Sequence, residues 1–168
     1  MSAFEIRRLG AADAESVGAL RIEGLRLHPE AFTADPERDA ALTQEQWRER
    51  LSQAGWFGAF RDGTLEGLAW YRAGSSFKTA HIGEFGAFYV REAARGTGAA
   101  RALLEAVLED AAGKIEQMKL AVNADNARAI KLYERLGFRT VGRIPDSIRV
   151  NGRSYDELIM LRQVSTSD

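Results

Sequence analysis

The chain has 168 residues, of which 45% are hydrophobic, and this composition predicts a single globular domain with its own core. Lysine and arginine total 23 against 24 for aspartate and glutamate, so the net charge of -1 gives no general attraction to nucleic acid. Cysteine is absent, which excludes disulfides and cysteine ligands, and two histidines are too few for a histidine-only metal site.

The ends of the chain carry no targeting signal that we recognise. Residues 1–8 lack the apolar core of a signal peptide, and no later run is long enough to span a bilayer. We therefore expect a cytoplasmic protein without a membrane partner. One domain is expected over residues 1–168, with the polar residues 165–168 as a disordered tail.

The first part of the sequence predicts a strand followed by two helices. Residues 4–9 alternate between apolar and polar like a strand. Asp13 stands where a helix N-cap is expected, and Thr43 with Gln46 has the spacing of a capping box ahead of a second helix. The segment between them, residues 28–41, contains prolines and is predicted as a loop. The residues expected on the inner faces of the two helices are Val17, Leu20, Gly24, Leu27, Trp47 and Leu51.

The middle and the end of the chain each carry a hairpin signal. An Asp-Gly or Asn-Gly pair between two strand-like runs favours a tight two-residue turn. Further strands are expected over residues 79–90 and 118–122, each followed by a helix, which indicates a mixed sheet. The two hairpin signals are Asp62-Gly63, between residues 56–61 and 64–73, and Asn151-Gly152, between residues 139–150 and 154–161.

The strand over residues 79–90 runs through an arginine and glycine loop directly into an amphipathic helix. The first amides of a helix have no intrahelical acceptor, and the helix dipole places partial positive charge at the same end. Arg95 adds a full charge, while small residues let a ligand approach the backbone. A simple turn stays the alternative, since many such junctions bind nothing. The small residues are Gly96, Gly98, Ala99 and Ala100, and the helix is expected to bury Leu103, Leu104, Val107, Leu108 and Ala111.

Two common phosphate-binding signatures do not fit this loop. The dinucleotide fingerprint needs a third glycine where the chain has Arg101, and the triphosphate loop needs a Gly-Lys-Ser/Thr that the sequence lacks. A third pattern, Arg/Gln-x-x-Gly-x-Gly/Ala, is filled by Arg95, Gly98 and Ala100.

A second segment farther along the chain makes the pattern specific. After the strand over residues 118–122, Asp125 and Asn126 are natural N-cap residues, and Ala129, Tyr133 and Leu136 recur at helical spacing. From spacing alone, Tyr133 reads as a core aromatic residue. The sequence here is Asn126-Ala127-Arg128-Ala129-Ile130-Lys131-Leu132-Tyr133-Glu134-Arg135-Leu136-Gly137-Phe138.

Together the two segments resemble the GNAT superfamily of acetyl-coenzyme A-dependent N-acetyltransferases, whose second signature is Asn-x-x-Ala-x-x-x-Tyr-x-x-x-Gly-Phe. The resemblance implies a mixed α+β fold, with a central, mostly antiparallel mixed sheet flanked by helices and splayed central strands that hold the cofactor. It also implies acetyl-coenzyme A as co-substrate and a direct attack of an amine on the thioester, with no metal and no protein nucleophile.

The resemblance assigns a role to individual residues. Tyr133 becomes the general acid for the departing thiolate, which is reasonable because a phenol titrates near about 10. Asn126 becomes a side-chain contact to the cofactor. Backbone groups of Phe88, Tyr89 and Val90 would bind the acetyl carbonyl and the pantetheine arm. The amides of Arg95, Gly96, Thr97, Gly98, Ala99 and Ala100 would hold the pyrophosphate.

The general base is predicted to be Glu84. It is the lone acid of an otherwise apolar strand, and it resembles the glutamate that histone-acetylating relatives use four residues before the acetyl-binding segment. A base matters because presenting a lysine-like amine in neutral form at pH 7 costs about 4 kcal/mol. The alternative is an acid facing solvent or pairing with an arginine. In the branch that acetylates ribosomal protein N-termini, a glutamate usually stands where this chain has Ala121, which weakens that branch.

The sequence leaves the acceptor open. A small-molecule amine or amino acid is favoured over a protein N-terminus or lysine, and a non-catalytic acetyl-coenzyme A sensor is the alternative of another class. A homodimer is common in such families, but no feature here demonstrates one. His28 is unassigned, and core or solvent roles are favoured for the remaining acceptor-side candidates, which are Phe32, Trp47, Trp56, Arg149, Tyr155, Asp156 and Glu157.

Overall fold

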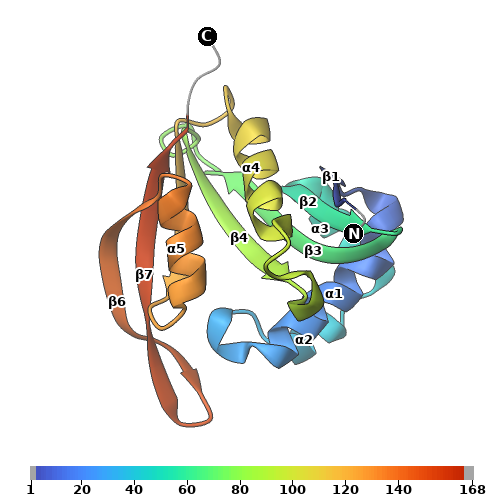
Figure 1. Ribbon diagram of the computed structural model, residues 1–168, viewed down its shortest axis with the longest axis horizontal. Helices are drawn as coiled ribbons and strands as arrows, with labels where there is room; N and C mark the ends of the chain where they lie inside the picture. The colour runs from blue at the N-terminus through green and yellow to red at the C-terminus, as the bar shows by residue number, and fades with distance from the viewer. Residues whose placement is uncertain (1–2, 165–168) are drawn as a thin grey trace.

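The computed structural model describes residues 3–164 and contains one seven-stranded sheet flanked by helices (Figure 1). The order of strands across the sheet is β1-β2-β3-β4-β5-β7-β6. The strands are β1 (Glu5–Arg8), β2 (Gly55–Arg61), β3 (Thr64–Ala73), β4 (Ile82–Val90), β5 (Gln117–Asn123), β6 (Arg139–Val150) and β7 (Arg153–Gln163). The α-helices are α1 (Ala14–Leu27), α2 (Pro36–Ala40), α3 (Gln44–Gln53), α4 (Ala99–Ala111) and α5 (Ala127–Arg135).

The centre of the sheet is splayed. Neighbouring strands pair antiparallel except β4 and β5, which run parallel and pair only from Ile82–Glu84 to Gln117–Lys119. Beyond Glu84 the two strands are not paired, although β4 continues to Val90 and β5 to Asn123. This confirms the predicted fold, a mostly antiparallel mixed sheet with splayed central strands.

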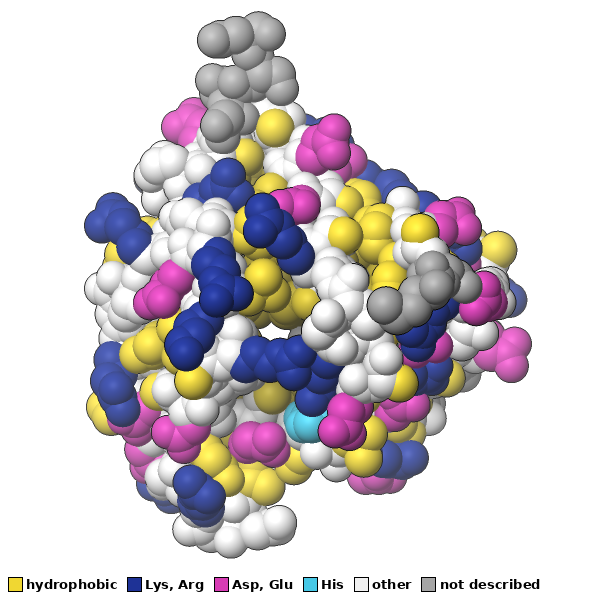
Figure 2. Space-filling model, viewed as in Figure 1, with side chains coloured by type: hydrophobic (Ala, Val, Ile, Leu, Met, Phe, Trp, Pro, Cys, Tyr) yellow, Lys and Arg dark blue, Asp and Glu magenta, His cyan; other side chains and the backbone are white. Residues whose placement is uncertain are grey.

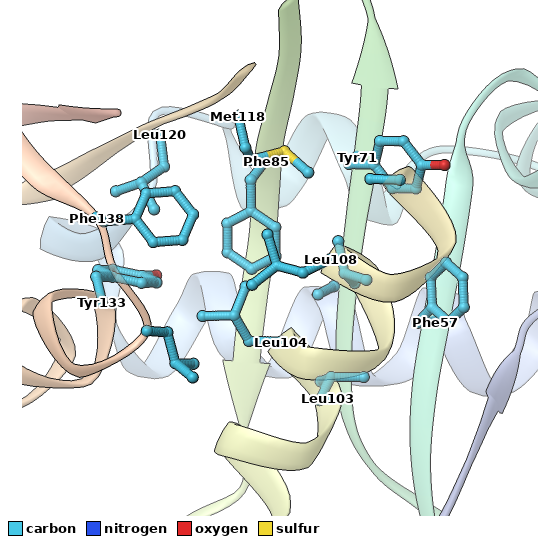
Figure 3. Packing of buried hydrophobic residues seen from close by; sticks show 14 of the residues in the cluster. Phe57, Tyr71, Phe85, Leu103, Leu104, Leu108, Met118, Leu120, Tyr133 and Phe138 are labelled. Atoms are coloured by element: carbon cyan, nitrogen blue, oxygen red, sulfur yellow. The ribbon is translucent and has the colours of Figure 1, made fainter. Parts of the chain in front are cut away.

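Two hydrophobic cores lie on the two faces of the sheet. The first packs α4 and α5 against the sheet through residues such as Leu103, Leu104 and Tyr133 (Figure 3). The second packs α1 and α3 against the other face through Leu20 and Trp47. The helix-forming apolar positions therefore face inward, as expected for helices that cover a sheet.

Several local predictions are confirmed by the backbone. Asp62 and Gly63 both have positive φ (50° and 76°), as do Asn151 and Gly152 (50° and 79°), which is the geometry of the tight hairpin turns that their sequences favour. Thr43 caps α3, because its hydroxyl accepts from the Gln46 amide while the Gln46 side chain accepts from the Thr43 amide.

Asp13 is the N-cap residue of α1, as predicted, but its side chain makes no capping hydrogen bond. Its carboxylate instead accepts from Arg7 at 2.8 Å and from the Gly10 amide at 2.9 Å. A guanidinium outcompetes a backbone amide for an acidic side chain because both partners are charged. Leu27, expected on the inner face of α1, is 63% exposed, since it is the last residue of the helix.

Three further differences concern boundaries. The expected loop over residues 28–41 contains the short helix α2, which begins at Pro36 after the N-cap Asp35. Strand β4 begins at Ile82 rather than three residues earlier, because residues 74–81 form turns. The predicted tail over residues 165–168 lies outside the described residues. No helix within residues 3–164 is both long and apolar enough to cross a membrane.

Candidate active site

The glycine loop after β4 leaves backbone amides free. Gly96 and Gly98 have positive φ (76° and 90°), and Gly98 is the N-cap of α4 without a side-chain cap. The first intrahelical bond in α4 is donated by the Ala102 amide to Gly98, so the amides before it have no intrahelical acceptor. A Cβ on Gly98 would meet no atom within 4 Å, so its outer side is open space. This is the geometry of an anion-binding helix N-terminus.

A bulge in β4 frees further backbone groups. The pairing with β3 passes from Tyr89, opposite Leu68, to Gly86, opposite Trp70. Ala87 and Phe88 therefore stand together opposite one residue of β3, and Ala87 has a φ of 52°. Such a bulge leaves ladder groups unpaired and turns the strand. It lies where β4 and β5 have separated, so these groups border the opening between them.

The loop, the bulge and α5 surround one cavity of about 600 Å³. Its first wall holds the loop and α5, and its second wall holds the segment after α1 together with the ends of β5 and β7. The first wall comprises Phe88, Tyr89, Val90, Arg95, Gly96, Gly98, Ala100, Arg101, Asn126, Arg128, Ala129, Leu132, Arg135 and Leu136. The second wall comprises His28, Glu30, Ala31, Phe32, Asn123, Asp125 and Tyr155.

The charges in this cavity are divided between the walls. The four arginines lie on the glycine loop, α4 and α5, whereas Glu30 lies on the segment after α1. The other acid of the lining, Asp125, directly precedes Asn126 and lies 3.6 Å from Arg153. Figure 2 shows basic side chains around a central opening, with a histidine and acidic side chains below it. One cavity therefore offers a cationic end for phosphates and an acidic end for a cation. The four arginines are Arg95, Arg101, Arg128 and Arg135.

Tyr133 projects from α5 into the core beside the cavity, and its ring is T-shaped to Phe85 and Phe138, at 6.1 Å and 5.8 Å between centroids (Figure 3). A third ring, Phe88, lies at 6.0 Å. The side chain is 5% exposed, and burial raises the pKa of its hydroxyl well above the usual range. Within the described residues this hydroxyl has no hydrogen-bond partner, so it is a neutral donor without a protein acceptor.

Asn126 both caps α5 and lines the cavity. Its side-chain oxygen accepts from the Ala129 amide at 3.2 Å, which confirms the predicted N-cap. Because the oxygen is used within the helix, its amide nitrogen is the group left for a ligand.

Arg95 joins the two walls. Its Nε donates to the Val90 carbonyl at 3.0 Å, and its Nη2 lies 3.1 Å from Nε2 of His28. A guanidinium only donates, so His28 Nε2 must accept and the ring proton must lie on Nδ1. His28, unassigned from sequence, is thus a direct link between the segment after α1 and the glycine loop.

Glu23 is a positioning residue that sequence reasoning missed. It accepts from the Tyr89 hydroxyl and from Arg91 Nε, each at 3.0 Å, so it anchors both residues that flank Val90. Burial and this carboxylate raise the pKa of Tyr89 to about 12. Gly24 is needed beside it, because a Cβ there would approach the Tyr89 ring to 2.8 Å. The only sequence signal was an acid one residue before a helical glycine, which is too common to interpret.

Glu84 does not reach the cavity wall. It lies at the start of β4 on the face opposite Phe85, its side chain is 53% exposed, and it pairs with Arg72 at 3.9 Å. On the adjacent strand β5, the residue paired with Glu84 is Lys119. The structure therefore separates Glu84 from the wall that holds Asn126, and its role as base stays a prediction.

The other acceptor-side candidates fall into three groups. Trp47 and Trp56 are core residues, as favoured, whereas Phe32 and Tyr155 line the cavity. The remaining three behave differently from one another: Arg149 is exposed and paired with Asp146, Asp156 is paired with Arg143, and Glu157 is buried. Among residues 3–164, no three acidic or histidine side chains gather in a metal-holding group.

Known proteins share this sequence and fold. Residues 21–138 match the family described as "Acetyltransferase (GNAT) family". A mycothiol acetyltransferase of Streptomyces scabiei is 36% identical over 122 residues, which cover 69% of this chain and 38% of the relative. The chain thus spans about two fifths of the length of the curated relatives that it matches.

Solved structures of other proteins have a similar fold. A GCN5-related N-acetyltransferase from Kribbella flavida has a TM-score of 0.81 and 29% identity, with 96% of this chain and 98% of that chain covered. A putative acetyltransferase from Salmonella typhimurium, solved with its cofactor acetyl-CoA, has a TM-score of 0.81 at 22% identity, with 99% of this chain and 97% of that chain covered. The second likeness concerns the fold alone. With the family match over residues 21–138, these findings show that the chain belongs to the GNAT acetyltransferase family.

Proposed function

We propose that the chain is an N-acetyltransferase that moves the acetyl group of acetyl-coenzyme A directly to a primary amine of a small molecule. The observation that carries this proposal is the division of charge in one cavity. Four arginines and the open N-terminus of α4 stand at one end, and Glu30 stands at the other, on the segment after α1. The first end suits a polyphosphate and the second suits an ammonium group.

The residues present fit the co-substrate. The amides from Gly96 to Ala100 would donate to the pyrophosphate, since they precede the first intrahelical bond of α4. The Arg95 amide, expected to join them, already donates to the Glu92 carbonyl at 3.0 Å, so Arg95 would contribute its side chain. The backbone of Phe88, Tyr89 and Val90 would hold the acetyl carbonyl and the pantetheine arm, because the bulge lies at Phe88 and this part of β4 is not paired with β5. Arg95 donates to the Val90 carbonyl, which leaves one acceptor position on that oxygen for the pantetheine arm.

Acetyl-coenzyme A would supply an activated acetyl thioester. The amine nitrogen forms a bond to the acetyl carbon, the carbon–sulfur bond breaks, and the electron pair leaves with sulfur. The amine proton goes to a base, for which Glu84 is the candidate, directly or through water. Tyr133 gives its hydroxyl proton to the sulfur. Its raised pKa makes it a weak acid, which stays protonated until the basic thiolate develops. An amide of the bulge aimed at the acetyl oxygen adds electrostatic stabilisation.

The acceptor class rests on the relatives and on the cavity. Curated relatives at 36% identity are named mycothiol acetyltransferases, which favours a small-molecule amine without naming this chain's substrate. The second wall belongs to a partly enclosed cavity of about 600 Å³, and a cavity of this size also favours a small acceptor.

The test is a thiol-release assay with acetyl-coenzyme A and a panel of amines, N-terminal peptides and polyamines, with Tyr133→Phe as the control. We expect release that depends on a small amine and falls in the variant. Release with peptides alone would replace the proposal by a protein acetyltransferase. Tight cofactor binding with no release for any amine would replace it by a non-catalytic sensor.

A further inference from the structure

Glu157 on β7 is a buried carboxylate without a cation. It is 7% exposed, and its Oε1 accepts from the Ser147 hydroxyl at 2.5 Å. In the part of the chain that the structure describes, it forms no ion pair. Its Oε2 has no hydrogen-bond partner there. Two side-chain atoms of the described residues are both fully buried and without a partner, Arg21 Nη1 and Asp39 Oδ2, and Glu157 Oε2 is not one of them. Oε2 therefore reaches accessible space.

The acids near Glu157 each have an arginine as partner. Asp156 is bound by Arg143 at 2.8 Å, Asp146 is bound by Arg149, and Asp125 lies 3.6 Å from Arg153. The hairpin thus neutralises each of these exposed acids with its own arginine. Glu157 is the most buried of these four acids and the one without a cationic partner, although an unpaired buried charge is the costliest to keep.

The position of Glu157 explains what that free oxygen faces. Across the β5–β7 ladder Glu157 stands directly opposite Asn123, and Tyr155 is two residues earlier on the same strand. Directly paired residues and residues two apart lie on one face of a sheet, so all three side chains share a face. Asn123 and Tyr155 line the second wall of the cavity. Glu157 is not itself one of the residues that line the cavity, but it adjoins two that are.

Asn123 also anchors the segment that carries Glu30. Its side-chain nitrogen donates to the Glu30 backbone carbonyl at 2.8 Å, which fixes the segment after α1 against the end of β5. Glu30 itself lines the cavity and is partly exposed. The backbone of Glu30 is therefore held at Asn123, while its carboxylate lies 3.9 Å from His28 Nδ1.

We propose that Glu157 binds a hydrogen-bond-donating group of the acceptor, an ammonium or a hydroxyl, that stands beside the reacting amine. This inference rests on the proposed function and names the acceptor class within it. A carboxylate has about four acceptor positions, and Ser147 fills one of them, so a donor from the acceptor supplies what the fold omits. Acceptors with a carboxylate at this place are repelled. Diamines and amino alcohols fit, and acidic amino acids do not.

The experiment compares wild type with Glu157→Gln on three matched acceptors: an n-alkylamine, the amino alcohol of equal length and the diamine of equal length. In the variant we expect the KM of the amino alcohol and the diamine to rise about tenfold, the loss expected for a hydrogen bond to a charged group. The KM of the alkylamine and of acetyl-coenzyme A stays within about twofold, because neither uses Glu157. A smaller effect for the amino alcohol than for the diamine identifies the ammonium as the favoured donor.

Controls separate binding from folding. Glutamine keeps the shape and can still accept from Ser147, so the thermal midpoint of Glu157→Gln should equal or exceed that of wild type, because a buried charge is removed. Glu66→Gln is the matched control, since Glu66 is part-buried on β3 and has Arg61 as partner at 4.0 Å. It should change none of the three KM values.

Two results overturn the inference: equal KM changes for all three acceptors, or no change for any of them. If wild type acetylates no amine, the proposed function fails, but calorimetry with coenzyme A present still decides the inference. Weaker binding of the amino alcohol and diamine to Glu157→Gln supports the site, and equal or absent binding to both proteins overturns it.

Discussion

The two ends of the cavity are built in different ways. The proposed phosphate end takes its backbone groups from one continuous stretch, from the bulge in β4 to the first turn of α4, and two of its four arginines, Arg128 and Arg135, from α5. The acceptor end comes from the segment after α1, the end of β5 and the start of β7, and it offers side chains. A backbone site needs a local pattern of small residues, whereas a side-chain site needs only that the fold bring separate segments together.

This difference predicts how the two ends respond to change. The phosphate end depends on conformations that only a few residue types tolerate. The acceptor end depends on single contacts between segments, such as the bond from Asn123 to the Glu30 carbonyl. Substitutions at the first should destroy cofactor binding, and substitutions at the second should change acceptor use while cofactor binding persists.

The largest effect is expected for Gly98→Val. Gly98 has a φ of 90°, a region that β-branched residues avoid, and its missing side chain leaves the open space beside the α4 amides. Losing two charge-assisted hydrogen bonds to a phosphate raises the Kd for coenzyme A about 100-fold or more. Calorimetry measures this Kd directly.

Gly63→Val is its matched control. Gly63 also has positive φ (76°) and no atom within 4 Å of an added Cβ, but it lies in the β2–β3 turn. It should lose stability through the same backbone strain while its Kd for coenzyme A stays that of wild type. If Gly98→Val binds coenzyme A like wild type, the phosphate end has been assigned to the wrong loop.

The next largest effect is expected for Tyr133→Phe. Removing a general acid lowers kcat about 100-fold, while the KM for acetyl-coenzyme A changes little. Because burial raises the pKa of Tyr133, the hydroxyl stays protonated across a neutral to mildly alkaline assay range, so its titration does not set the alkaline limb of the profile. Since the hydroxyl has no described partner, the thermal midpoint should not fall. An unchanged kcat at neutral pH would remove Tyr133 from the acid role and leave it a core aromatic.

The features that could be predicted from the sequence are those set by neighbouring residues, and the features that could not are contacts between distant segments. Hairpins at Asp62 and Asn151, the capping box of α3 and the glycine loop before α4 follow from the local sequence, and the structure has them. That this loop binds phosphate stays a prediction. Glu23 and Glu157 do not follow, because what sets them apart is the partner across the fold: Tyr89 and Arg91 for one, and a missing cation for the other. Spacing along the chain carries no information on such pairs.

Asp39→Ala is the third prediction and concerns the support of the acceptor end. Asp39 on α2 is buried and accepts from Arg50 at 2.9 Å, with Arg21 at 3.6 Å. Burial lowers the pKa of Arg21 while Asp39 opposes that shift, so the variant leaves a buried cation uncompensated. We expect a loss of about 3 kcal/mol in unfolding free energy.

The same variant should raise the acceptor KM more than the cofactor Kd, because Arg21 stacks on Phe32 of the second wall at 4.9 Å. Glu37→Ala is the control on the same helix, since its pair with Arg26 is mostly exposed and contributes little. Chemical denaturation and steady-state kinetics measure the two effects. An equal rise in the cofactor Kd would mean that the two ends are not independent.

The smallest effect, and the one that sharpens the comparison most, is expected for Glu84→Gln. If Glu84 accepts the amine proton, kcat/KM falls about tenfold or more at neutral pH, and the loss shrinks as the pH approaches the pKa of the free amine, where no base is needed. Arg72→Met is the control, because it breaks the half-exposed pair with Glu84 but keeps the carboxylate. The two variants should have similar thermal midpoints and different pH profiles. Matching, flat profiles would reduce Glu84 to a surface ion pair. A pH-dependent loss confined to Glu84→Gln would instead extend the acceptor end beyond the cavity wall, along the sheet to the place where β4 and β5 begin to separate.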